Sequence, residues 1–335
     1  MAVLLISQAI ADRCTDDFRR IEAETGFGIE PLIVPAGDDE QVPEEQIDRI
    51  ELSFFSLDMI GNVLGRRFFG ATRRAPNLKW MQVGHAGTDA AVFGEVVKNG
   101  AQLSNASGSA AEPIAQTAIG GLLALARGFV PWGEAQRARE WRPLEAPQIP
   151  SDLSSQTMVV LGVGAIGSHI ARLGQALGLH VVGVRRSPRV DGDPVDEMTT
   201  PDRLHEVLPR ADWLALTVPL TEQTRGIIGV EALALLPAGA HILNVARGPV
   251  IDEGAMIEAL RSGSLGGAYL DVFETEPLPE DSALWDLPNV IVSPHNSANS
   301  RGNAARSLAI FVRNLEHWAR GEPLEQEVTA AKRET

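Results

Sequence analysis

Three residues in the last third of the chain have side chains that suit acid–base chemistry, and each follows an apolar run typical of a strand. They are Arg247, Glu276 and His295. Imidazole exchanges protons near neutral pH, a paired carboxylate can orient the ring and favour its charged form, and a guanidinium holds a carboxylate in a rigid fork. Taken singly, His295 could be a structural loop histidine and Glu276 a capping acid. The combination favours a catalytic set, and because strand ends meet at one edge of a parallel sheet, we predict that the three side chains converge.

A glycine-rich turn precedes these segments. Gly162, Gly164 and Gly167 form a GxGxxG pattern directly after an apolar strand and directly before a helical pattern. The first glycine allows a tight turn, the second lets a pyrophosphate approach the backbone, and the third lets helix and strand pack closely. The amides at the helix N-terminus would then face the phosphates. The pattern predicts a dinucleotide site that includes Ala165 and Ile166, and a glycine turn without ligand is the alternative.

The strand that follows this unit ends in basic residues. An acidic residue there normally accepts hydrogen bonds from the ribose 2′-hydroxyl of NAD, whereas arginine accommodates the 2′-phosphate of NADP. Here the position is held by Arg185, with Arg186 and Ser187 beside it. Two guanidiniums and a hydroxyl would bind a phosphate through charge-assisted hydrogen bonds. We therefore expect NADP(H) to be preferred over NAD(H). The alternative is that both arginines are merely solvated at a strand end.

Apolar runs alternate with helical patterns along nearly the whole chain. This alternation predicts an α/β protein with two doubly wound parallel sheets, each covered by helices on both faces. A final amphipathic helix is expected from about Asn299 to Arg320. The expected strands are 2–7, 29–34, 52–57, 78–83 and 101–105 in the first series, and 158–164, 180–185, 212–218, 240–246, 266–272 and 289–295 in the second.

The segment 112–153 separates the two series. Residues 112–130 predict one long apolar helix, opened by Glu112 and Pro113. Residues 131–153 are rich in Pro, Trp and charge and predict an irregular arm. Either this segment packs against a second subunit and makes a homodimer, or the helix is buried between the two domains. The expected domains are 1–110 with 298–335, which binds substrate, and 111–297, which binds the dinucleotide and includes the arm.

Composition restricts the partners. The chain has 335 residues, with 29 Lys and Arg against 44 Asp and Glu, so its net charge is −15. This charge argues against nucleic acid and anionic membranes as main partners. The single cysteine, Cys14, suits a reducing compartment, and the chain start lacks a signal-peptide pattern, so a cytoplasmic location is expected. The histidines share no spacing that would indicate a metal site.

Taken together, the motifs resemble the D-isomer-specific 2-hydroxyacid dehydrogenase family over nearly the whole chain. The matching segments are LKWMQVGHAGTD, LGVGAIG, VPLTEQTRGII, NVARGPVIDE, LDVFETEPLP, LPNVIVSPH and the closing GEPL. The resemblance implies a Rossmann cofactor domain inserted into a flavodoxin-like substrate domain. It implies that Arg247 holds the substrate carboxylate and polarises its carbonyl, and that Glu276 orients His295, the proton donor. It also implies cofactor contacts at Val218, Pro219, Thr224, Val245, Ala246 and Asp271, the last toward the nicotinamide carboxamide.

The substrate is less well specified. The loop that opens with Val83, Gly84 and His85 resembles one whose backbone amides bind the substrate carboxylate, and Phe54 or Phe55 could form a pocket wall or belong to the core. Asn296 and Ser297 follow His295, where relatives commonly have small apolar residues. The leading prediction is NADP(H)-dependent reduction of a small 2-keto acid, similar to glyoxylate or hydroxypyruvate, to the D-2-hydroxy acid. The alternatives are an NAD-dependent dehydrogenase of a larger D-2-hydroxy acid and a non-catalytic, corepressor-like dinucleotide sensor.

Overall fold

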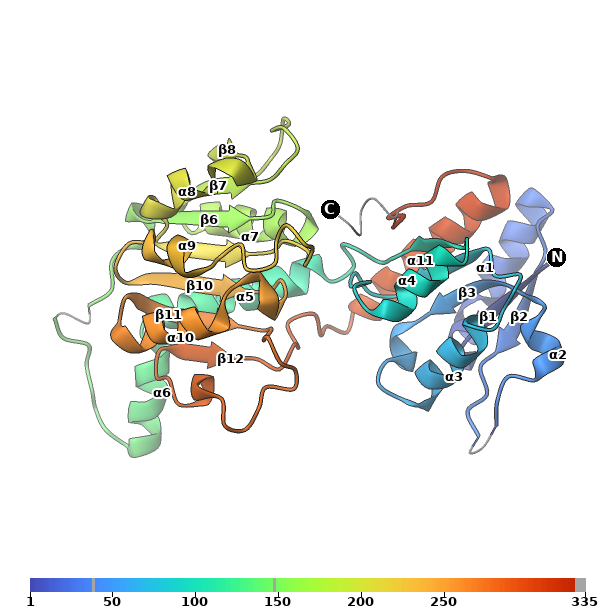
Figure 1. Cartoon of the computed structure of the whole chain (residues 1–335), viewed down its shortest axis with the longest axis horizontal. Coiled ribbons are helices and arrows are strands. Elements are labelled where there is room, and N and C mark those ends of the chain that lie inside the picture. Colours follow the sequence, from blue (N-terminus) through green and yellow to red (C-terminus); the bar gives the residue numbers. More distant parts are fainter. Residues whose placement is uncertain (38–39, 147–148, 329–335) are drawn as a thin grey trace. The chain divides into compact units, whose positions relative to one another are not determined.

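The computed structural model describes residues 1–37, 40–146 and 149–328. The chain divides into two compact units (Figure 1). Unit 1 consists of Met1–Ala110 and Ser300–Thr335, and unit 2 of Ala111–Asn299.

Unit 1 is built on a five-stranded sheet in which every neighbouring pair is parallel. The strand order is β2-β1-β3-β4-β5, and β1 lies inside the sheet with all five of its residues buried. This order is that of a flavodoxin-like sheet. The strands are β1 (Ala2–Ile6), β2 (Ile29–Ile33), β3 (Ile50–Phe55), β4 (Trp80–Val83) and β5 (Gln102–Ser104).

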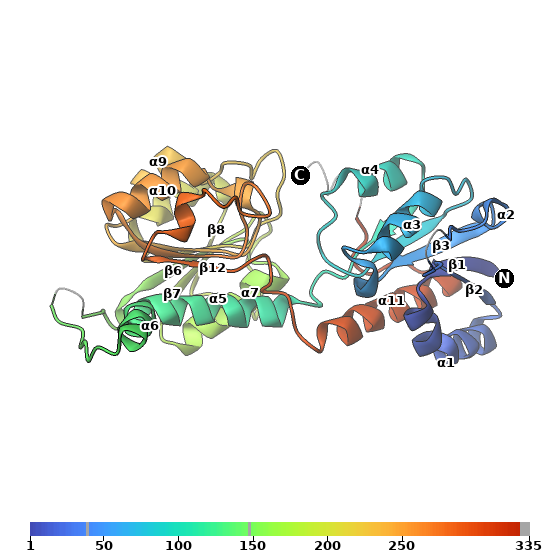
Figure 2. The same ribbon diagram turned by 90° about the horizontal axis from the view of Figure 1, so that it is seen from below.

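Helices cover both faces of this sheet (Figure 2). On one face, α1 (Gln8–Thr25) and α11 (Asn303–Arg320) contribute Cys14, Phe18 and Phe311 to a core with Trp80. On the other face, α3 (Val63–Thr72) and α4 (Ala91–Lys98) pack into a second core. Burial raises the pKa of the Cys14 thiol to about 12, so this thiol is inert at neutral pH. The remaining short elements of unit 1 are α2 (Glu44–Ile47) and the 3-10 turn η1 (Leu57–Met59).

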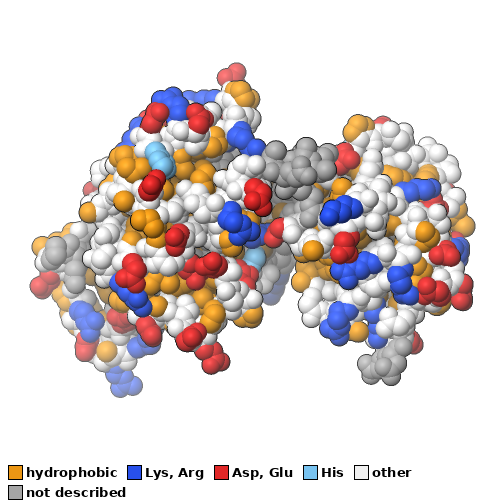
Figure 3. All heavy atoms as spheres, viewed as in Figure 1, with side chains coloured by type: hydrophobic (Ala, Val, Ile, Leu, Met, Phe, Trp, Pro, Cys, Tyr) orange, Lys and Arg blue, Asp and Glu red, His pale blue; other side chains and the backbone are white. Residues whose placement is uncertain are grey.

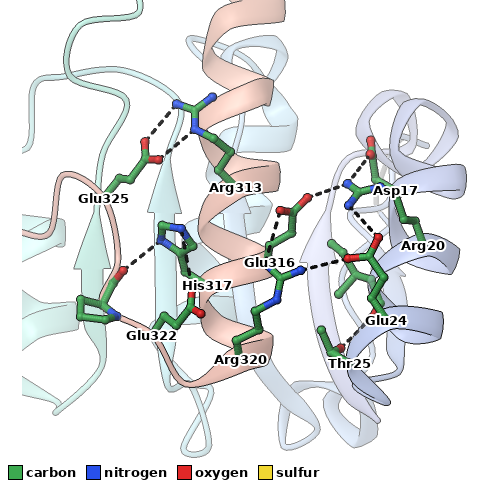
Figure 4. A network of polar contacts seen from close by, with 12 residues as sticks. Asp17, Arg20, Glu24, Thr25, Arg313, Glu316, His317, Arg320, Glu322 and Glu325 are labelled. Carbon is green, nitrogen blue, oxygen red and sulfur yellow. Dashed lines mark hydrogen bonds and ion pairs between the residues drawn. The ribbon is translucent and has the colours of Figure 1, made fainter.

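The last helix belongs to unit 1 although it follows unit 2 in the chain. Arg20 on α1 binds Glu316 on α11 at 2.6 Å, and Arg320 binds Glu24 at 2.9 Å (Figure 4). Beneath these partly exposed pairs, Asn314 donates to the side-chain oxygen of Gln82 on β4 at 2.8 Å, in a fully buried position. Exposed ion pairs contribute little, so we attribute the docking of α11 mainly to its apolar face and this buried bond.

Unit 2 is built on a seven-stranded, wholly parallel sheet with the order β12-β11-β10-β9-β6-β7-β8. The chain starts at β6, proceeds to β7 and β8, and then crosses to β9, so the direction of winding reverses between β6 and β9. This point is where open α/β sheets bind ligands. The strands are β6 (Thr157–Leu161), β7 (His180–Val184), β8 (Glu197–Thr199), β9 (Trp213–Leu216), β10 (Ala240–Asn244), β11 (Leu265–Leu270) and β12 (Val290–Val292). The predicted fold of two doubly wound parallel sheets is confirmed.

Helices cover both faces of this sheet, as Figure 2 shows, and an apolar core lies beneath each layer of helices. The helices α5 (Ala111–Ala126) and α7 (Ala165–Ala176) pack on one face, around Val160, Ile170 and Tyr269. The helices α9 (Val230–Ala234) and α10 (Glu253–Ser262) cover the other face, together with α8 (Leu204–Val207). Short 3-10 turns complete the unit at η2 (Leu153–Ser155), η3 (Pro201–Arg203), η4 (Leu208–Arg210), η5 (Gly248–Val250) and η6 (Ala283–Trp285).

The helix expected over 112–130 is α5, and a second helix occupies the start of the segment expected as an irregular arm. After α5, the chain bends by 68° at Arg127 and Gly128, and α6 (Phe129–Ala138) follows. Gly128 has φ of +77°, which an α-helix cannot accommodate, and Pro131 lies in the first turn of α6, where its missing N–H costs nothing. The irregular arm therefore begins only after residue 138. No single helix in the described ranges is long and apolar enough to cross a membrane, although the bent α5–α6 pair reaches that length and hydropathy when both helices are counted.

His241 is a partly buried titratable group outside the predicted site. Its ring stacks on Trp213 with centroids 4.3 Å apart, and burial lowers its pKa to about 4. In the unfolded chain the pKa of His241 is about 6.5. Between about pH 4 and 6.5 the unfolded state therefore binds a proton at this residue and the folded state does not. We expect the free energy of unfolding to fall between pH 6.5 and 4 by at most about 3 kcal/mol from this residue. Urea titrations of the wild type and His241→Phe at pH 7 and 5 measure it; equal losses in both proteins would contradict the assignment.

Candidate active site in unit 2

The predicted catalytic residues follow three neighbouring strands whose ends are in register. Asn244 on β10 pairs with Leu270 on β11, which pairs with Val292 on β12. Arg247, Glu276 and His295 come shortly after these three strand ends. Because the strands are parallel and aligned, the structure brings all three segments to the same edge of the sheet.

His295 and Glu276 are directly paired. The imidazole Nδ1 lies 2.7 Å from Glu276 Oε2, and the backbone N–H of Phe273 donates to Glu276 Oε1 at 3.1 Å. A carboxylate only accepts hydrogen bonds, so Nδ1 carries the proton of this bond and Nε2 is left for another partner. His295 has φ of +50°, a left-handed conformation fixed by its N–H, which donates to the Asp271 carbonyl at 2.9 Å. His295 is therefore held both through its ring and through its backbone, while 46 % of its side chain stays exposed.

Asp271 holds the loop that carries His295. Its buried carboxylate accepts from the N–H of Asn296 at 2.8 Å and of Ser297 at 3.1 Å, and from the hydroxyls of Ser293 and Ser297. Ser297 thus contributes both its N–H and its hydroxyl to this contact. Both oxygens of Asp271 are engaged in positioning the loop, a role that the sequence analysis did not anticipate. The predicted contact with the nicotinamide carboxamide stays a prediction.

Arg247 is positioned by a close approach of two loops. The next residue, Gly248, packs against the backbone of Phe273 and Glu274: a Cβ on this glycine would lie 1.9 Å from the carbonyl carbon of Phe273. Only glycine fits, so the Arg247 loop and the loop leading to Glu276 are locked together. The guanidinium donates from Nη1 to the carbonyl of Ala246 at 2.7 Å and is half-buried.

The glycine turn connects β6 to α7 as predicted from its pattern. Gly162 has φ of +104°, and a Cβ on Gly167 would lie 2.0 Å from the Gly162 carbonyl oxygen, so the turn and the helix are in direct contact. No side chain caps the N-terminus of α7, which begins at Ala165 and continues with Ile166. The backbone amides of this first turn can therefore bind an anion such as a pyrophosphate. The residues present fit a dinucleotide.

The other predicted cofactor contacts follow the ends of β9 and β10. Val218 follows β9 and lies against Gly162. Thr224 donates its hydroxyl to the Pro219 carbonyl at 2.6 Å, so it shapes the loop from within. Val245 and Ala246 are buried directly after β10.

At the end of β7, Arg185 is already engaged in the chain itself. Its guanidinium binds Asp193, with Nη2 and Oδ2 2.6 Å apart, and only 15 % of its side chain is exposed. Arg186 and Ser187 are exposed. The expected group of phosphate ligands is thus divided into one arginine paired with an acid and two exposed residues.

The predicted substrate loop lies in unit 1, after β4. The N–H of Gly84 donates to the Phe55 carbonyl at 2.8 Å, and its carbonyl accepts from Ser307 at 2.7 Å. Val83 is buried, and His85 is half-buried with its ring 5.9 Å from that of Phe55. Phe54 and Phe55 are buried and belong to the core of unit 1. The role of these residues toward substrate stays a prediction from resemblance.

Residues 119–297 match the family described as "D-isomer specific 2-hydroxyacid dehydrogenase, NAD binding domain". The match covers more than half of the chain and includes the glycine turn and all three predicted catalytic residues. The chain belongs to the D-isomer specific 2-hydroxyacid dehydrogenases. It is an NAD(P)-dependent oxidoreductase, and the resemblance found in the motifs is confirmed.

Individual relatives are similar over nearly their full length. The glycerate dehydrogenase of Methylorubrum extorquens is 31 % identical over 290 residues, which cover 84 % of this chain and 87 % of the relative. A dehydrogenase of this family from Xanthobacter autotrophicus, solved with NADPH, is 30 % identical with a TM-score of 0.74 and 98 % of both chains covered. An NADPH-dependent glyoxylate/hydroxypyruvate reductase from Sinorhizobium meliloti, solved with NADP and sulfate, is 26 % identical with a TM-score of 0.76 and 99 % of both chains covered.

The dehydrogenase presents a mixed surface. On the face shown in Figure 3, acidic and basic side chains are interspersed over each unit. Among the described residues, no group of three or more His, Cys, Asp or Glu side chains is arranged to hold a metal ion.

Proposed function

We propose that this dehydrogenase reduces a small 2-keto acid, of the size of glyoxylate or hydroxypyruvate, to the D-2-hydroxy acid with NADPH. The observation that supports this most directly is the His295–Glu276 pair at 2.7 Å, on a strand edge shared with Arg247. A site that only senses nucleotides has no need of an oriented proton donor. The names of the relatives, a glycerate dehydrogenase and a glyoxylate/hydroxypyruvate reductase, support the substrate class.

In this proposal each residue has one task. When bound, the reduced nicotinamide supplies a hydride to the carbonyl carbon. His295 donates a proton from Nε2 to the carbonyl oxygen, which becomes the hydroxyl of the product. Glu276 stabilises the charged imidazole through Nδ1, and Arg247 holds the substrate carboxylate and polarises the carbonyl. In the reverse direction His295 accepts the proton.

We infer that unit 2 binds the nucleotide, with the amides after Gly164 toward the pyrophosphate and the β7 end toward the adenosine ribose. Arg186 and Ser187 are exposed at that end and are the proposed ligands of a 2′-phosphate. The two solved relatives that contain NADPH or NADP support this preference. NAD-dependent oxidation of a larger D-2-hydroxy acid is the alternative. The pairing of Arg185 with Asp193 favours NAD over NADP but does not bear on the size of the substrate.

One experiment separates these functions. The purified protein is mixed with NADPH or NADH and a panel of 2-keto acids of increasing size, and nicotinamide absorbance is followed. We expect the highest kcat/KM with NADPH and the smallest keto acids. Higher kcat/KM with NADH and branched acids would favour the alternative dehydrogenase. Nucleotide binding with no turnover on any acid would favour a sensor and overturn the proposal.

We also propose that the enzyme is a cytoplasmic homodimer whose second copy covers α6 and the arm after it. Four large apolar side chains are exposed within this short segment, Phe129, Trp132, Trp141 and Ile149, and Trp141 is 98 % exposed. Exposed apolar surface of this kind is typical of association surfaces, and the rings of Phe129 and Trp132 lie together with centroids 5.6 Å apart. Light scattering should give twice the chain mass of 35.9 kDa, and Trp141→Ser should shift the protein toward the monomer.

A further inference from the structure

The guanidinium expected to bind a 2′-phosphate binds a carboxylate of its own chain. Arg185 Nη1 donates to Asp193 Oδ1 at 2.8 Å, and Nη2 donates to Oδ2 at 2.6 Å. Nε and Nη2 also donate to the carbonyls of Ser187 and Pro188 at 3.1 and 2.6 Å. Parallel double bonds of this kind are also how a guanidinium binds a phosphate. Asp193 therefore uses the same donors that a 2′-phosphate would need.

The Asp193 carboxylate is built into its loop. Its side chain is 7 % exposed, and the N–H of Val190 donates to Oδ2 at 2.7 Å. The Asp193 carbonyl accepts from Val195 at 2.9 Å, so backbone bonds hold the residue on both sides. The pairing with Arg185 lowers the pKa of Asp193, so the carboxylate stays charged near neutral pH. A fixed negative charge thus lies beside the end of β7.

We propose that Asp193 is a specificity-determining residue that weakens binding of 2′-phosphorylated nucleotides by competing with the phosphate for Arg185. A 2′-hydroxyl carries no charge and has little to gain from this guanidinium. A 2′-phosphate must displace the carboxylate or bind beside an arginine whose charge is already neutralised. The proposal rests on the proposed nucleotide site in unit 2, but it concerns the change caused by Asp193 and holds whichever nucleotide the wild type prefers.

The test compares two fragments that lack the nicotinamide, 2′,5′-ADP and 5′-AMP, by isothermal titration calorimetry on the wild type and Asp193→Asn. Asparagine keeps the size of the side chain and removes its charge. We expect Asp193→Asn to bind 2′,5′-ADP about tenfold more tightly, the scale of one hydrogen bond to a charged group, and to bind 5′-AMP as the wild type does. The readout does not depend on turnover, so it is independent of the catalytic residues.

Two further variants make the result specific. Asp191→Asn removes the same charge from the same loop at an exposed position, and we expect less than about a twofold change from it. In an Arg185→Gln background, the gain from Asp193→Asn should disappear, because the freed donor is absent. An equal gain from Asp191→Asn, or a gain that persists without Arg185, would overturn the competition.

Loss of affinity for both fragments in Asp193→Asn would also overturn the proposal, since it would mean that Asp193 only supports the loop. If the wild type and every variant bind neither fragment, the nucleotide site of unit 2 is wrong and the proposal fails with it. If the wild type prefers 5′-AMP while Asp193→Asn gains for 2′,5′-ADP alone, the NADPH preference fails and the role of Asp193 stands.

Discussion

His295→Gln is expected to lower kcat for keto-acid reduction about 10²–10⁴-fold, the range for loss of a general acid. The Nδ1 atom is committed to Glu276 at 2.7 Å, so Nε2 is the ring atom left to donate to the carbonyl oxygen in the proposed reaction. Glutamine can hydrogen-bond at this position but does not release a proton near neutral pH. Affinity for the nucleotide should stay close to that of the wild type. Absorbance kinetics and calorimetric titration with the nucleotide measure the two effects separately.

The backbone at His295 requires a second variant. Its φ of +50° strains most side chains, whereas asparagine adopts this conformation readily. His295→Asn should therefore lose activity as His295→Gln does while keeping the loop intact. His205→Gln makes the same chemical change on the exposed surface of α8 and is the matched control. If both His295 variants kept kcat within a few-fold of this control, His295 would not be the proton donor.

The alignment of the site could be predicted from the sequence because it follows from regular elements. Apolar runs locate β10, β11 and β12, and parallel strands bring the residues after their ends to one edge. The positions of Arg247, Glu276 and His295 relative to the sheet can then be predicted without knowing any side-chain contact. The glycine turn is predictable for a similar reason, since Gly162 and Gly167 meet steric demands of the strand–helix connection, while Gly164 has open space beside it for a ligand.

What could not be predicted depends on contacts within irregular loops. The pairing of Arg185 with Asp193 joins two residues of a loop without periodicity, and no spacing rule indicates it. The role of Asp271 was missed because a carboxylate at a strand end is equally suited to a ligand and to neighbouring N–H groups. The buried Ser297 hydroxyl needs an acceptor, and the sequence alone does not show that this residue is buried.

Two elements were missed for reasons of local sequence. β8 is three half-buried residues at the sheet edge, too short to show alternation. α6 follows a glycine bend and contains Pro131 and Gly133, which in a sequence usually indicate a loop. This helix begins where Gly128 adopts a positive φ of 77°. The start of a helix that depends on the φ angle of one residue is difficult to predict from amino-acid composition.

Arg247→Lys is expected to lower kcat/KM about 10²–10³-fold, the cost of removing one preorganised donor from a developing oxyanion. Gly248 is locked against Phe273, so the backbone beside residue 247 cannot move to bring a lysine into place. Lysine keeps the positive charge, but its three N–H donors share one nitrogen instead of being spread over a planar fork, so it binds the carboxylate and the carbonyl together less well. We expect KM to rise and kcat to fall, because both tasks are lost.

Arg261→Lys on α10, an exposed arginine paired with Glu258, is the matched control for this prediction. Binding of oxamate, an unreactive analogue of a 2-keto acid, should weaken in Arg247→Lys and not in Arg261→Lys. Equal oxamate affinity in the two variants would mean that other residues bind the substrate carboxylate and that Arg247 only stabilises the loop after β10.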